Sequence, residues 1–169
     1  IMDMLRDNIT ETANVYLSDE TVHDNWNVAG LRDHYLGFFT EPDDLQFTAD
    51  ELGGIEKKDI VEILYKKAVA KYEEKEAEIG PDRMREVERV VLLRNVDSKW
   101  MDHIDAMDEL RKGIYLRSYA QRDPVVEYRL EGFDMFDEMV ASIREDTIKM
   151  LLTVRLRNPE EEPKREQVS

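Results

Sequence analysis

The amino-acid sequence predicts an all-α protein built around a long antiparallel helical hairpin, and three observations support this. The 169 residues include only 7 Gly and 5 Pro, whereas hydrophobic residues make up 41% and charged residues 37%. Apolar residues recur every three or four positions over long stretches, as they do on one face of an α-helix. Residues that start or stop helices separate those stretches. We find no internal repeat and no convincing strand pattern.

The first predicted helix covers residues 1–17. Its apolar stripe consists of Met2, Leu5, Ile9, Ala13 and Tyr16. No capping residue precedes Ile1, so we expect this segment to be the end of a longer helix. A short N-terminal helix is the alternative.

For residues 18–80 the sequence predicts a smaller helical region, in which turns separate shorter helices. Asn27 is placed to cap a helix over 28–39, and Thr48 with Glu51 has the spacing of a capping box. The segment TEPDD at 40–44 predicts a turn, and a longer helix follows over 55–79 until Gly80-Pro81 stops it. The inward faces of the two longer helices are predicted to be Val28, Leu31, Tyr35 and Phe38, and Ile60, Ile63, Leu64, Ala68 and Tyr72.

The hairpin is predicted over residues 81–156. One helix runs over 82–112, and Asp123 caps a second helix that has Pro124 at its first position. The joining segment 113–122 is too short for anything but an antiparallel arrangement. We expect the two helices to pack through Trp100, Ile104, Phe133, Phe136 and Val140, and expect Trp26 and Trp100 to be core anchors. Residues 157–169 lack an apolar stripe and predict a disordered C-terminal linker.

The charge is acidic overall and basic at the predicted tip. The net charge is -15, which repels phosphate backbones and argues against nucleic acid as a partner. Between residues 111 and 122, in contrast, there is no acid. The side chains that stand out there are the cations Arg111, Lys112, Arg117 and Arg122 and the aromatics Tyr115 and Tyr119. A basic, aromatic tip on an acidic hairpin indicates a segment that enters a partner.

Motifs for chemistry are weak. The sequence has no GxxxxGK[ST], GxGxxG or HExxH spacing and no Cys, so it offers no phosphate-binding loop, zinc motif or thiol nucleophile. An acidic cluster lies on the first hairpin helix: Asp102, His103, Asp105, Asp108 and Glu109. A carboxylate metal centre in a bundle needs Glu-x-x-His pairs on facing helices, and only Trp100-x-x-His103 is present. We therefore interpret the cluster as a solvated helix face and expect neither catalytic nor metal-binding residues.

The segment 97–136, DSKWMDHIDAMDELRKGIYLRSYAQRDPVVEYRLEGFDMF, resembles the two-helix finger of the SecA family, the ATPases of bacterial preprotein translocation. W-x-x-H and MDxLRxGIxLRxYAQxDP are in register with that family. Residues 18–80, with NW at 25–26 and GLR at 30–32, are similar to its helical wing domain, and residues 1–17 to the end of its scaffold helix.

The resemblance implies a role for the tip. In the family the finger enters the cytoplasmic funnel of the SecY channel, and its tip aromatic contacts the translocating preprotein. Carried over, that aromatic is Tyr119, with a tyrosine folded back onto its own hairpin as the alternative. The residues expected to contact substrate or channel are Tyr119, Arg117, Gln121, Arg122 and Tyr115. In the family the hairpin also packs on the motor and restrains its ATPase, a role that Arg117 and its basic neighbours would share. The regulatory or packing residues are expected to be Arg111, Lys112 and Trp100.

The resemblance also implies what this chain does not do alone. The family's motor domains, which bind ATP and Mg, are absent from the sequence, so no cofactor and no ATPase activity are expected here. The parent protein would be cytoplasmic and peripheral on the bacterial cell membrane, and would meet the anionic membrane surface only through its other parts. A stand-alone helical adaptor that binds partner proteins without catalysis is the second functional hypothesis.

Overall fold

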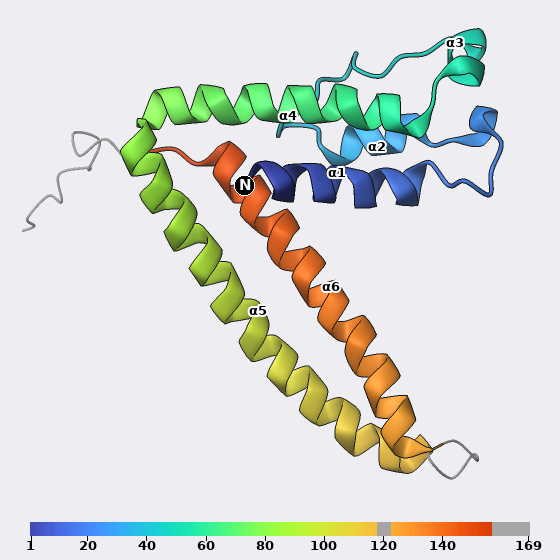
Figure 1. Ribbon diagram of the computed structural model, residues 1–169, viewed down its shortest axis with the longest axis vertical. Coiled ribbons are helices and arrows are strands. Elements are labelled where there is room, and N and C mark those ends of the chain that lie inside the picture. The colour runs from blue at the N-terminus through green and yellow to red at the C-terminus, as the bar shows by residue number, and fades with distance from the viewer. Residues whose placement is uncertain (118–122, 157–169) are drawn as a thin grey trace, which may run out of the picture.

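The computed structural model confirms the all-α prediction and describes residues 1–117 and 123–156. The helices are α1 (Met2–Tyr16), α2 (Val28–His34), α3 (Ala49–Gly54), α4 (Lys57–Ile79), α5 (Pro81–Arg117) and α6 (Pro124–Thr153), with a 3-10 turn η1 (His23–Asn25). Figure 1 shows two parts: α1 to α4 form a body, and α5 and α6 leave it together as a long hairpin. The predicted tail, 157–169, lies outside the described residues.

The body is held together by one apolar core. Leu5, Ile9 and Ala13 of α1 are buried against Ile60 and Leu64 of α4. These residues recur at helical spacing, as the sequence predicted, so each helix presents one continuous apolar face to the other. The core also takes in Trp26, which confirms its predicted role as an anchor. The last turns of α6 complete it with Ile148, Leu151 and Leu152.

Helix α2 is shorter than predicted. It begins after Asn27, whose side chain accepts a hydrogen bond from the Gly30 N–H at 2.9 Å, but it ends at His34 rather than at residue 39. The chain then turns at Gly37, which has a φ of 83° that side-chain-bearing residues rarely adopt. Thr40 closes the turn by donating its hydroxyl hydrogen bond to the Arg32 carbonyl at 2.7 Å. An apolar stripe through Phe38 had extended the predicted helix past this turn.

The cap signals predicted within residues 18–80 are confirmed with small shifts. Thr48 and Glu51 form the capping box that opens α3. Helix α4 begins at Lys57 instead of residue 55, because Glu56 and Asp59 make a second capping box. It ends at Gly80, whose φ of 95° turns the chain out of the helix directly into α5.

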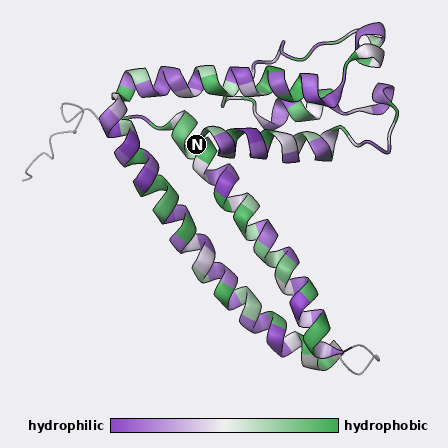
Figure 2. Ribbon diagram, in the orientation of Figure 1, coloured by the Kyte–Doolittle hydropathy of each residue, from purple (hydrophilic) through white to green (hydrophobic). Residues whose placement is uncertain are grey.

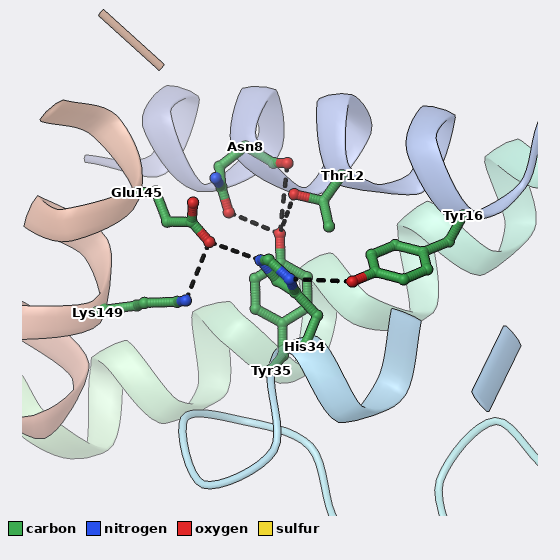
Figure 3. Close-up of polar contacts among 7 residues, drawn as sticks. All are labelled: Asn8, Thr12, Tyr16, His34, Tyr35, Glu145 and Lys149. Carbon is green, nitrogen blue, oxygen red and sulfur yellow. Dashed lines mark hydrogen bonds and ion pairs between the residues drawn. The ribbon is translucent and has the colours of Figure 1, made fainter. Parts of the chain in front are cut away.

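A buried polar cluster lies where α1 meets α2 (Figure 3). The Tyr35 hydroxyl lies 2.6 Å from the Asn8 Oδ1 and 2.9 Å from the Thr12 Oγ1. Burial raises the pKa of Tyr35 well above its usual range, because the ring is enclosed and a phenolate there would lose its water. These hydrogen bonds satisfy a hydroxyl inside an otherwise apolar core.

Candidate functional site: the helical hairpin

The first helix of the hairpin, α5, is longer than the sequence predicted. Helix α5 has 37 residues, which at 1.5 Å each makes a rod of about 55 Å. It continues through Gly113 to Arg117, and Ile114 in this last stretch is buried. The segment between the helices is therefore 118–122 and not 113–122. On the return side, the Asp123 carboxylate accepts from the Val125 N–H at 2.9 Å and caps α6, as predicted.

Most of the predicted tip residues lie outside the described part of the chain. This holds for Tyr119, Gln121 and Arg122. Arg117 is the last residue of α5 and Tyr115 lies one half-turn earlier, but the described structure does not include their side chains. The geometry brings their backbone to the far end of the hairpin, and their contacts stay a prediction.

The other two tip cations are paired within their own helix. Arg111 lies 2.9 Å from an Asp108 carboxylate oxygen, and Lys112 lies 3.1 Å from the other. Hydrogen bonds from Lys112 and Arg111 lower the pKa of Asp108, and the same carboxylate raises the pKa of Lys112. The basic stretch is thus partly neutralised by the acids just before it. A count of charges between residues 111 and 122 does not reveal this neutralisation, because the compensating acids are Asp108 and Glu109.

Trp100 does not anchor a core, so that prediction is wrong. Its side chain is 47% exposed, and it lies with His103 and Phe136 in a row of rings on the outside of the hairpin. The ring centroids are 5.6 Å apart for Trp100 and His103 and 5.9 Å apart for His103 and Phe136. Two helices alone cover only the narrow strip that faces the partner, so a wide apolar stripe remains half in water.

The rest of the predicted packing set is corrected in the same way. Ile104 and Phe133 are exposed, with Phe133 at 67%, and Val140 is half-buried. The fully covered positions between the helices are others: Asn95, Leu110, Ile114, Gly132 and Thr147. Among these, the Asn95 amide donates to the Thr147 hydroxyl at 3.0 Å, a polar contact that fixes the register of α5 against α6.

A shallow apolar hollow opens midway along the hairpin. It has a volume of about 380 Å³ and is lined by His103, Met107, Tyr128, Arg129, Gly132, Phe133 and Phe136. Gly132 allows the close approach, because a Cβ there would lie 3.0 Å from the Met107 Cε. Figure 2 shows hydrophobic segments continuing along both hairpin helices away from the body. This is a surface for apolar contact and carries no chemistry of its own.

The acidic cluster of α5 shows no metal-binding geometry. Over residues 1–117 and 123–156, no three His, Cys, Asp or Glu side chains converge as metal ligands. Asp108 is instead occupied by its two helix neighbours. No helix within those ranges is both long and apolar enough to cross a membrane.

Sequence reasoning missed one set of contacts altogether. His34 of α2 meets Glu145 of α6, and Glu11 of α1 meets Arg144 of α6. These partners are 111 and 133 residues apart. No local pattern marks them, because each lies on a solvent-exposed or half-buried helix face typical of many charged residues.

Comparison with known proteins agrees with this architecture. The family described as the SecA Wing and Scaffold domain matches residues 1–155. A protein translocase subunit SecA of Pelotomaculum thermopropionicum is 40% identical over 162 residues, which is 96% of this chain and 18% of that protein. SecA 1 of Alkaliphilus metalliredigens is 41% identical over 100% of this chain and 18% of its own length. SecA of Clostridium botulinum is 43% identical over 166 residues, which is 95% of this chain and 19% of that protein. The chain thus spans less than a fifth of the length of these curated relatives.

Proposed function

Because this chain belongs to the family of SecA wing and scaffold domains, we propose that it serves as the scaffold, wing and finger portion of a protein-translocating ATPase. In this role it has no catalytic centre of its own. ATP and Mg bind in the motor domains of the parent protein, and the hairpin carries their movement to a preprotein in a SecY-type channel. The parent works in the cytoplasm and peripherally at the membrane.

The observation that carries the proposal is the shape and rooting of the hairpin. Helix α6 has its last turns buried in the body core, while the opposite end lies a hairpin length away. A helix pair about 45–55 Å long, fixed at one end, moves its far end when the root moves. The wing and scaffold helices supply the stiff base for this lever. The relatives contain the matching segment within proteins about five times longer, which favours this function over a stand-alone adaptor.

We assign contact with the preprotein to Tyr119, which lies in the sequence between α5 and α6. An aromatic ring can grip many sequences through apolar contact without requiring one hydrogen-bond partner. Arg117 and Arg122 stand beside it and would meet acidic groups of the channel or motor domains, in a contact weakened by salt. Arg111 and Lys112 contribute less positive charge to such a contact, since Asp108 already pairs with them.

The test is a set of variants in a full-length parent that carries this sequence. Tyr119→Ala should reduce preprotein transport far more than basal ATPase, and Tyr119→Phe or Tyr119→Trp should keep most transport because the ring is retained. Arg117→Ala should change basal ATPase or channel affinity in a salt-dependent way. Leu116→Ala, which removes an exposed apolar side chain from the last turn of α5, is the matched control and should leave transport near its normal rate.

Melting temperatures of the same variants separate the competing account. If Tyr119 were folded onto its own hairpin, Tyr119→Ala would lower thermal stability and harm transport and ATPase together. A second measurement concerns regulation: the 169-residue chain, added in trans, should lower the ATPase rate of the matching motor domains. Equal rates with and without saturating chain would end the regulatory part of the proposal.

A further inference from the structure

A polar junction joins the hairpin to the body where α6 passes α1 and α2 (Figure 3). The Glu145 Oε1 lies 2.6 Å from the His34 Nε2 and 3.0 Å from the Lys149 Nζ. On the other side of the imidazole, the Tyr16 hydroxyl lies 3.5 Å from the His34 Nδ1. One carboxylate of the hairpin is therefore held between a cation on its own helix and a ring on the body.

Two residues of α6 near Glu145 also contact the body. Arg144 donates to the Glu11 carboxylate of α1 at 2.7 Å. Lys149 lies 5.1 Å from the centre of the Phe38 ring, which follows α2. Three residues within six positions of α6 thus each reach a different part of the body. Such a concentration of polar contacts occurs at the point where the hairpin leaves the core.

The polar junction differs from the apolar root beside it. Ile148, Leu151 and Leu152 are buried in the core, and their burial holds the end of α6 in place. His34 and Glu145, in contrast, remain about a quarter to a third exposed at the side chain. Water can replace the contacts of a partly exposed pair at small net cost, whereas exposing the root would cost its whole apolar burial. The junction can open while the root stays closed.

We propose that His34, Glu145 and Lys149 form a latch that sets the direction in which the hairpin leaves the body. With the latch closed, α6 is held against α1 and α2, and the hairpin moves together with the body. With the latch open, the hairpin swings about its buried root, which consists of the end of α6 and of Met84 in the first turn of α5. The use of this swing in transport rests on the proposed function, but the latch itself is a property of this chain and is tested without transport.

The carboxylate of Glu145 is the element on which the latch depends. A neutral His34 with its proton on Nε2 donates to Glu145 and accepts from Tyr16 on Nδ1, and a charged His34 still donates to Glu145. The titratable and charged groups that meet at the junction are Tyr16, His34, Glu145 and Lys149, with the Arg144–Glu11 ion pair and the Tyr35 hydroxyl beside them.

A distance measurement between the body and the hairpin tests the latch. The chain contains no cysteine, so Val15→Cys and Leu130→Cys create two unique sites for spin labels on exposed positions of α1 and α6. Leu130 lies 15 residues before Glu145, about 22 Å along the helix, so a swing of about 10° moves its label by about 4 Å. Pulsed electron resonance on the labelled chain resolves such a change.

Three latch variants are compared in this labelled background. Glu145→Leu removes the charge and the hydrogen bond, and should broaden and shift the distance distribution. Glu145→Gln keeps an acceptor for His34 and should have a smaller effect. The exchange Glu145→Lys with Lys149→Glu keeps the ion pair within α6 but removes the acceptor that faces His34, so it should behave like Glu145→Leu. Glu138→Gln, at an exposed position of the same helix, is the matched control.

Amide hydrogen exchange distinguishes an opened latch from general destabilisation. In Glu145→Leu, we expect amides over residues 140–146 to exchange about tenfold faster, while amides over 148–152 keep their protection because the root stays buried. Unchanged distances in both Glu145→Leu and the Lys–Glu exchange would overturn the latch. So would equal acceleration of all amides, which would show that Glu145 only contributes to overall stability. Neither result would bear on the transport role of Tyr119.

Discussion

The body and the hairpin are both built from helices that carry apolar residues at helical spacing, yet they bury very different amounts of apolar surface. In the body, α1 and α4 close over each other with α2 and the end of α6, and Leu5, Leu31 and Leu64 are fully buried. In the hairpin, α5 has only α6 as a partner over most of its length, and side chains such as Phe133 and Leu130 stay exposed. An apolar stripe therefore marks a helix face, and the number of neighbours decides whether it becomes core.

The largest contrast is expected from two leucine truncations. Leu64→Ala, at a fully buried position of α4, should lower the free energy of unfolding by about 2–5 kcal/mol. Leu130→Ala, at a 60% exposed position of α6, should change it by no more than about 0.5 kcal/mol. Urea denaturation of both variants measures the difference. Equal losses would break the comparison, because they would place Leu130 in a core as well.

The next effect concerns the buried hydroxyl of the body. Tyr35→Phe leaves Asn8 and Thr12 without their partner and should cost about 1–3 kcal/mol of unfolding free energy. Tyr16→Phe is the control, because its hydroxyl makes only a 3.5 Å contact with His34 and its loss should cost about 0.5 kcal/mol or less. Thermal melts of the two variants should therefore rank in that order, and the reverse order would contradict the assigned hydrogen bonds.

A smaller effect, of opposite sign, is expected in the hairpin. Gly113 lies inside α5, and within the described part of the chain a Cβ added there would meet no atom within 4 Å, so Gly113→Ala should stabilise the chain by about 0.5–1 kcal/mol through helix propensity. Gly132→Ala should gain less, since its Cβ would lie 3.0 Å from the Met107 Cε. Denaturation midpoints for the pair test this, and an equal gain would mean that the helices do not approach closely at Gly132.

The smallest effect is an acid dependence at Glu145. Burial alone would raise the pKa of Glu145, but hydrogen bonds from Lys149 and His34 outweigh burial and lower the pKa below its ordinary value. As pH falls, the unfolded chain binds this proton before the folded chain does. The stabilisation is thus present above the ordinary pKa and is lost as pH falls through the folded-state pKa.

Denaturation midpoints of the parent and of Glu145→Gln, measured between about pH 6 and pH 3, check this sign. The variant should lose part of the acid dependence, and Glu138→Gln should retain it. A parent and variant with parallel pH profiles would show that the Glu145 contacts do not favour the ionised carboxylate.

Much of the fold could be predicted from local sequence, because helix boundaries depend on nearby residues. Asn27, Thr48 and Asp123 cap their helices through side chains two or three residues from the N–H groups they satisfy. The end of α2 was missed, since a stripe through Phe38 continued past the point where Gly37 turns the chain. The tip prediction rested on resemblance, and Tyr119 remains outside the described residues.

The all-α class, the hairpin and most caps can be predicted from the order of the residues alone, since they depend on the 3.6-residue period and on short-range hydrogen bonds. The packing of the helices, in contrast, is what buries Trp26 and leaves Trp100 half exposed, because burial depends on how many helices surround a position. It alone also placed His34 against Glu145. Contacts between distant residues depend on how the helices cross, and no local pattern of charge or periodicity encodes that crossing.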